Sequence, residues 1–173
     1  MNRQIMEKEV TIKIEVRELL HDIRNKTYLT KAARSVAGLS PEAASDMQAD
    51  ESSSDKYQLG RTLAHAFEGV KNVVSEYLEE GEESGTNQIK KEIDNEGQLT
   101  LDLMMPDNFD KNAIGLLTES VHAYMVTTAL AEWFMVKNPN EAQYYIKEIP
   151  GCISAIRVAI YKRNRPERPN CDY

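Results

Sequence analysis

The stretch LGRTLAHAFEGVKNVVSEY, from Leu59 to Tyr77, decides the helical part of the fold, and QIKKEIDNEGQLTLDLM, from Gln88 to Met104, decides what is inserted into it. In the first stretch apolar residues recur at spacings of 4-3-4-3-4, at Leu59, Leu63, Ala66, Val70, Val73 and Tyr77. This spacing predicts a helix that packs one face on a core, because a coiled coil needs a longer heptad run. Ser52, with Asp55 three residues later, is the expected N-cap, and Gly81 is the expected end.

The second stretch predicts a β-hairpin. Apolar and polar residues alternate over 89–93 and again over 99–103, and residues 94–97 between them suit a turn. A hairpin alone is marginally stable in water, so it must pack on helices or pair with another strand. We expect hairpin 88–104 to project from the helical body and to contact a neighbouring chain through Leu99, Leu101 and Leu103. Residues 10–14 offer a third strand, from the same subunit or the next.

The N-terminal part combines a strand, a helix and a long polar stretch. Alternating β-branched and polar residues predict a short strand from Glu9 to Ile14, and a helix from about Glu15 to Val36 that stops at Gly38. Residues 39–54 are mostly small and polar, and a loop of this length in a compact domain is usually functional or disordered.

The C-terminal part predicts an αα-hairpin. A first long helix ends near Met135. Asn138 is the expected N-cap of the second helix, with Pro139 in its first turn and Glu141 placed to close a capping box. Apolar residues continue at helical spacing, at Tyr145, Ile149, Ile153, Ile156 and Ile160. Pro150 lies inside this pattern and removes one backbone hydrogen bond, so we expect a kink or break there.

The expected fold class is mainly α: a helical bundle of about four long helices with an inserted β-hairpin and a short N-terminal strand. A chain of 173 residues is long enough to bury one sizeable core. We expect a single helical domain over residues 1–163 and an extended Arg/Pro arm over residues 164–173.

Charge is distributed unevenly along the chain. The formal net charge of −7 argues against unspecific nucleic-acid binding. Residues 76–96 hold eight acidic residues against two lysines, whereas residues 157–168 hold five basic residues against one acid. Opposite charges on one chain suit contacts between neighbouring copies, although solvated loops explain the same pattern equally well.

No targeting or membrane signal is visible. The first residues lack the apolar region of a secretory signal, and no apolar run approaches the length of about 18 residues that suggests a membrane span. Cys152 and Cys171 form neither a CxxC motif nor a disulfide framework. A reducing, cytosolic compartment is the expected setting.

Catalytic and metal-binding patterns are incomplete. Glu119 and His122 are spaced as half of a di-iron motif, but His65 and Glu68 stand in the reverse order, so the full ligand set is absent. Cys152 has no histidine placed beside it and is expected to be a core residue. We expect no catalytic residue, no metal and no cofactor. A metalloenzyme on a helical bundle, the least favoured alternative, would require those two glutamates and two histidines to meet in space.

The C-terminal tail carries Arg163, Arg165 and Arg168 next to Pro166 and Pro169. The prolines favour an extended backbone with exposed side chains. No stacking platform or recognition module accompanies the arginines, so DNA reading is not expected. Arginine forks suit carboxylates, and we expect these arginines to contact an acidic surface of another subunit.

The order helix, helix, hairpin, helix, helix over residues 56–163 resembles the head–tail connector (adaptor or neck-ring) proteins of tailed bacteriophages. The hairpin behind the long 59–77 helix and the extended tail after Ile160 carry this resemblance. The segment LAEWF (130–134), followed by NPNEA (138–142), is similar to small neck and tail-completion proteins of phages and prophages from gut bacteria. The N-terminal strand and the 39–54 stretch depart from the family's minimal pattern.

The resemblance implies a structural virion protein without catalysis or cofactor. Such a protein is made in the host bacterial cytoplasm and forms a ring, here expected to contain about twelve copies. The ring docks under the portal protein and holds the tail or other neck proteins, while DNA passes through an acidic lumen that repels its phosphates. The main alternative is a small cytosolic helical adaptor or regulatory subunit, which would run as a monomer or dimer.

Overall fold

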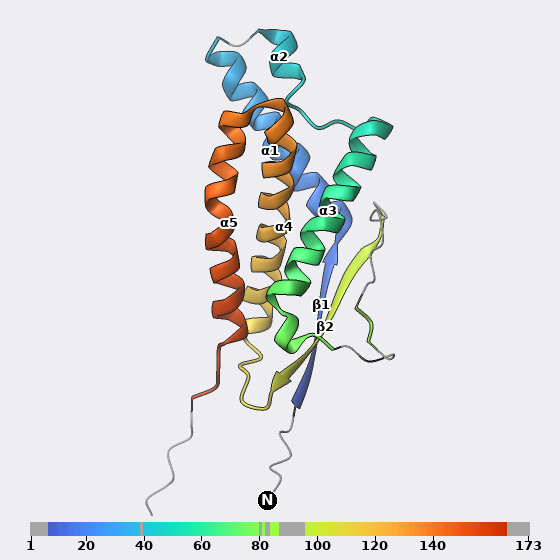
Figure 1. The fold of residues 1–173 in the computed structure, drawn as a ribbon, viewed down its shortest axis with the longest axis vertical. Helices are drawn as coiled ribbons and strands as arrows, with labels where there is room; N and C mark the ends of the chain where they lie inside the picture. The colour runs from blue at the N-terminus through green and yellow to red at the C-terminus, as the bar shows by residue number, and fades with distance from the viewer. Residues whose placement is uncertain (1–6, 39, 80, 82–83, 87–95, 166–173) are drawn as a thin grey trace, which may run out of the picture.

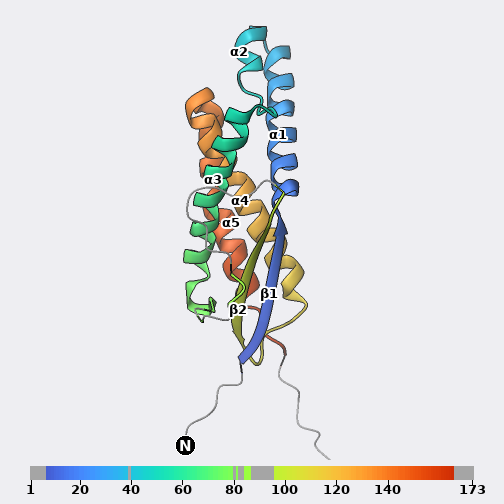
Figure 2. The ribbon, with the colours of Figure 1, turned by 90° about the vertical axis from the view of Figure 1, so that its right-hand side faces the viewer.

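The computed structural model describes residues 7–38, 40–79, 81, 84–86 and 96–165, and it is mainly helical (Figure 1). Its elements follow the order β1 (Glu7–Glu15), α1 (Val16–Val36), α2 (Pro41–Ser45), α3 (Ser53–Val73), the 3-10 turn η1 (Ser75–Tyr77), β2 (Gln98–Pro106), α4 (Ala113–Lys137) and α5 (Pro139–Ile160). The long helices and the ribbon of β1 and β2 form an elongated body (Figure 2). The predicted mainly helical fold class, with a small β-element and an N-terminal strand, is confirmed.

Strands β1 and β2 form an antiparallel ribbon with one apolar face. The apolar pairs that face each other are Val10 and Leu103, Ile12 and Leu101, and Ile14 and Leu99. All of these side chains are buried, whereas Thr11 and Lys13 on the opposite face are exposed. The N-terminal strand, a candidate third strand in the sequence, is thus a partner of β2 within the same chain. The predicted first arm of the hairpin, 89–93, lies outside the described residues.

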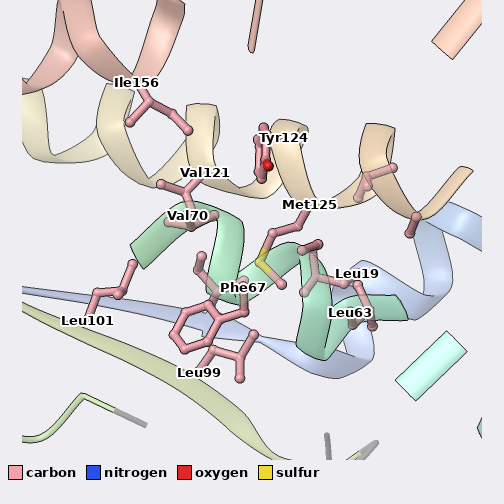
Figure 3. Close-up of a cluster of buried hydrophobic side chains, with 14 of the residues drawn as sticks. Leu19, Leu63, Phe67, Val70, Leu99, Leu101, Val121, Tyr124, Met125 and Ile156 are labelled. Carbon is pink, nitrogen blue, oxygen red and sulfur yellow. The ribbon is translucent and has the colours of Figure 1, made fainter. Parts of the chain in front are cut away.

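The core lies between the long helices and the apolar face of the ribbon (Figure 3). Side chains from β1, α1, α3, β2, α4 and α5 meet in this cluster, among them Leu19, Leu63, Phe67, Leu99 and Val121. The predicted packing of the α3 face is confirmed, because its leucines are buried in the same cluster as those of α4. Val73 of the α3 face and Ile153 of α5 are partly buried against this cluster.

Two predicted helix starts are confirmed. The Ser52 side chain accepts a hydrogen bond from the Asp55 N–H at the start of α3, and the Asn138 side chain accepts one from the Asn140 N–H at the start of α5. Glu141 does not close the predicted capping box, because its carboxylate pairs with Arg34 of α1 instead.

Of the predicted kink or break at Pro150, the break is absent, because α5 is continuous from Pro139 to Ile160. Pro150 is exposed; its ring removes the hydrogen bond to the carbonyl of Ile146 and crowds that carbonyl. Burial of Ala142, Ile156 and Ala159 in the α4–α5 hairpin holds the helix on both sides of the proline.

The polar stretch between α1 and α3, predicted as a long loop that is either functional or disordered, contains a short helix and is an ordered connection. Its short helix α2 is capped by Ser40, whose hydroxyl accepts a hydrogen bond from the Ala43 N–H. Met47 and Ala49 are buried. Trp133 Nε1 donates to the Met47 carbonyl at 2.8 Å, and these contacts fasten the stretch to α4.

The body has two distinct ends (Figure 1, Figure 2). The C-terminal half of α1 and the short α2 lie at one end, and the chain enters β1 and leaves α5 at the other. At the first end Arg34 forms an ion pair with Glu141 of α5. Burial beside this contact raises the pKa of Tyr145 above its ordinary value.

Candidate functional site

The predicted contact leucines are buried in the chain's own core. Leu99, Leu101 and Leu103 are 3%, 1% and 0% exposed, because they lie on the ribbon face that the helices cover. Strand β2 lies along the helical body rather than projecting from it (Figure 2). The structure therefore corrects this prediction: the three side chains are not available to a neighbouring chain while the domain is folded.

Hydrogen bonds hold the first residues of the C-terminal tail, Arg163 and Asn164, against the helical body. Arg163 donates to the carbonyl of Ile160 at 2.5 Å and so satisfies an acceptor at the end of α5. The Asn164 N–H donates to the Asn108 carbonyl at 2.8 Å. Arg163 is thus a helix-capping residue in this chain, and its role as a partner contact stays a prediction. Arg165 is exposed, and Arg168 lies outside the described residues.

Asp102 is a buried carboxylate that the sequence did not single out. At 7% exposure it accepts hydrogen bonds from Thr11 Oγ1 at 2.7 Å and from the Gly85 N–H at 2.5 Å. Its own N–H donates to Thr86 Oγ1 at 2.9 Å. A Cβ at Gly85 would lie 2.6 Å from the carboxylate, so glycine permits this close approach. Asp102 therefore holds residues 84–86 against the ribbon.

A polar cleft of about 560 Å³ lies between α1 and α4. Its lining residues are Arg17, Glu18, His21, Asp22, Glu119 and His122. His122 Nε2 lies 2.9 Å from Asp22 Oδ2 and connects α4 to α1. Spacing along the sequence could not reveal this pair, since its members are 100 residues apart.

A second cleft, of about 530 Å³, lies between α3 and α4 and contains His65. His65 Nδ1 lies 2.7 Å from Glu132 Oε1. On α4, Glu132 and His122 differ by ten positions, which is about 15 Å of helix rise, so the two histidines belong to separate sites. Among the described residues, no group of three or more His, Cys, Asp or Glu side chains is arranged to hold a metal ion.

The remaining candidate nucleophile packs as an ordinary side chain. Cys152 is half-buried on α5, with its Sγ 3.8 Å from Thr127 Oγ1. None of the histidines in the two clefts contacts it. Among the described residues, the four residues of the metalloenzyme alternative thus do not gather at one site; His122 and His65 each lie beside a carboxylate of another helix.

Basic and acidic groups lie close together at the end where the chain leaves α5. Arg157, Lys162 and Arg165 are exposed there, and Glu76 is exposed in η1. The rings of Tyr77 and Tyr161 meet edge to face at 6.2 Å between centroids, which makes η1 and the end of α5 neighbours. None of the ion pairs within the described residues joins the two charged groups. We call the surface formed by Arg157, Lys162, Arg165 and Glu76 the charged end.

Comparison with models of protein families, with characterised proteins and with solved structures finds no match. Every functional inference therefore starts from the chain's own residues. In the part of the chain that the structure describes, no helix combines the length and apolar character that crossing a bilayer requires.

Proposed function

We propose that this chain is a structural ring subunit, a head–tail connector that joins the portal to the tail of a tailed bacteriophage. The observation that carries the proposal is the charged end, where exposed bases follow α5 beside the exposed Glu76 of η1. In a ring, copies stand side by side, so the basic group of one copy meets the acidic group of the next at the same level. Two different surfaces in contact generate a closed ring when the rotation is right.

The fixed root of the tail supports this role. Arg163 and Asn164 are tied to the carbonyls of Ile160 and Asn108, so the chain leaves the body in a set direction. Arg165 is the first tail arginine beyond these bonds and is exposed. Its guanidinium can pair with a neighbour's carboxylate without giving up a bond within its own chain.

The polar clefts fit a structural protein. Each contains a histidine paired with a carboxylate from another helix, at 2.9 Å for His122 and 2.7 Å for His65. In the proposed particle the subunit contacts the portal and other neck or tail proteins, and DNA passes through the lumen. The net charge of −7 disfavours retention of DNA there. The protein would reside at the virion neck, and the copy number of about twelve belongs to the proposal.

Deletion of residues 165–173 tests the proposal. The truncation removes Arg165 and everything after it but keeps the bonds of Arg163 and Asn164, so we expect an unchanged melting temperature and loss of the ring. Light scattering measures the mass of the full-length and truncated chains, and electron micrographs show the symmetry of the full-length particle.

A charge control separates arm length from arm charge. Arg165→Gln with Arg168→Gln keeps the full length, and we expect it to weaken the ring as the deletion does. Lys147→Gln, on the exposed surface of α5, should leave assembly unchanged. A truncated chain that assembles like the full-length chain would contradict the proposal.

A small helical adaptor is the second candidate, and a different observation favours it. Tyr28, Leu29 and Val36 are exposed on the C-terminal half of α1, at the opposite end from the tail. Such an apolar surface suits one protein partner. An adaptor would run as a monomer or dimer in the mass measurement and would show no ring in micrographs.

A further inference from the structure

The hydrogen bonds around Asp102 show which backbone groups of β1 point outward, away from β2. The Asp102 carbonyl accepts from the Glu79 N–H and its N–H donates to Thr86, so both backbone groups point away from β1. Thr11, which faces Asp102 in the register, therefore belongs to a non-hydrogen-bonded pair. Because the two kinds of pair alternate, residues 10, 12 and 14 bond to β2, and residues 9, 11 and 13 direct their N–H and C=O groups outward.

A second bond supports this alternation. The Val16 N–H donates to the Gly97 carbonyl at 3.1 Å, in the same register as the ribbon and on the side of β2. Even-numbered positions from 10 to 16 thus face the partner strand. The odd-numbered positions carry the backbone groups of the outer edge.

Among the described residues, no strand lies beyond this outer edge of β1. In the part of the chain that the structure describes, the sheet contains β1 and β2, and no bridge pairs another segment with β1. Figure 2 shows β1 at the rim of the ribbon. Glu9, Thr11 and Lys13 have exposed side chains on the face opposite the core. A nine-residue edge with unpaired backbone groups is a template for a further strand.

We propose that the β1 edge pairs antiparallel with the β1 edge of a second copy of this chain, about a two-fold axis at Thr11. The local sequence is Glu9-Val10-Thr11-Ile12-Lys13, and an antiparallel copy is its own charge complement. Glu9 then faces Lys13 of the second copy, and Lys13 faces its Glu9. Neither residue takes part in an ion pair within the described residues.

Neighbouring registers are less favourable. Outward groups belong to odd residues, so the pairing shifts only in steps of two. A shift in one direction faces Glu9 with Glu15 of the second copy. The opposite shift faces Lys13 with Glu7 but pairs less of the strand. The proposed register pairs all of β1.

The β1 contact is separate from the ring contact proposed above. A two-fold contact uses the same surface on both copies and closes with two chains, whereas a cyclic ring uses two different surfaces. The ring contact involves Arg165 and η1, and no residue of β1. Loss of either contact leaves the other in place, so the two proposals fail independently.

Charge exchange tests the register. Glu9→Lys and Lys13→Glu each place like charges opposite each other twice, and each should raise the dimer dissociation constant about tenfold or more. The double variant restores both opposite pairs in exchanged order, and we expect its dissociation constant to return to within about threefold of the native value. Analytical ultracentrifugation of the full chain measures both effects, and Lys147→Glu on exposed α5 should have no effect.

The backbone gives an independent test. Lys13→Pro removes an outward N–H and leaves the bonds to β2, a position where edge strands tolerate proline, so the dimer should be lost while the circular dichroism spectrum stays helical. In hydrogen exchange, the amides of Thr11 and Lys13 should slow as concentration rises, and the amide of Ile12 should be slow throughout. The proposal is overturned if the native chain does not dimerise through the β1 edge. It is also overturned if the dimer of the double charge variant dissociates as readily as the dimers of the single variants.

Discussion

The two halves of α1 contain similar apolar residues in opposite surroundings. In the first half Leu19 and Ile23 are both 0% exposed, in the core that α4 and the ribbon share. In the second half Leu29 is 56% exposed and Val36 is 91% exposed. The helix continues through both halves, from Val16 to Val36. Apolar residues thus determine which face a helix can bury, while the rest of the fold determines whether that face is covered.

The contacts of the second half are few and polar. Arg34 pairs with Glu141 of α5, and Lys31 Nζ donates to Gln48 Oε1 at 3.0 Å. Segments with few buried apolar contacts open at lower free energy than the core. We therefore expect this end of α1 to exchange its amides faster than the first half.

Leucine truncation in each half should give the largest contrast. Leu19→Ala removes a buried side chain and should cost about 2–5 kcal/mol of unfolding free energy. Leu29→Ala is the same change on the same helix. It should cost less than about 0.5 kcal/mol of unfolding free energy after correction for the difference in helix propensity between leucine and alanine. Denaturant melts measure both. Equal costs would mean that the second half is packed as tightly as the first.

Loss of the Asp102 carboxylate should lower the unfolding free energy less than loss of the Leu19 side chain, but more than loss of the Arg34–Glu141 ion pair. Asp102→Ala removes the acceptor for Thr11 and for the Gly85 N–H, and we expect a loss of about 1–3 kcal/mol. Asp102→Asn keeps one carbonyl oxygen and should lose less. Denaturant melts give the loss, and faster hydrogen exchange at Gly85 in the alanine variant would locate it. No change at Gly85 would count against this role.

The ion pair between Arg34 and Glu141, in which the arginine side chain is 49% exposed and the glutamate side chain 12% exposed, should give the smallest effect. Arg34→Ala removes the pair with Glu141, and because Arg34 is half-exposed the unfolding free energy should fall by about 1 kcal/mol or less. Raising the salt concentration should narrow the difference between variant and native chain. A salt-independent loss well above that value would show that the arginine stem packs as well as pairs.

Local signals predicted the starts of α3 and α5 and the end of α1, but not the end of α3, which lies at Val73 rather than near Gly81. Ser52 and Asn138 cap α3 and α5 as their positions indicated, and Gly38 has the positive φ of +92° that suits the residue after a helix end. Each of these features depends on residues within three or four positions of one another, so each could be predicted from the local sequence. The helix does not break at Pro150, because the packing of α5 on α4 offsets the lost hydrogen bond and the crowding of the Ile146 carbonyl.

Contacts between distant residues were not predictable. Asp22 pairs with His122 across 100 positions, and Glu141 pairs with Arg34 across 107. Asp102 alternates with leucines as an ordinary outward residue of a strand, and its burial arises only because residues 84–86 fold over it. The contact leucines of the expected projecting hairpin are core residues for the same reason, since their apolar face looks alike whether helices or a neighbour cover it.

The sequence by itself determined the long helices, their caps, the alternation in β1 and β2, and the uneven charge, because each depends on residue type and near-neighbour spacing. Tertiary structure alone decided that β1 pairs with β2, that Leu99 to Leu103 are covered, and that Arg163 caps α5. Burial and pairing depend on which surfaces meet, and residues far apart in the chain supply those surfaces only after it has folded.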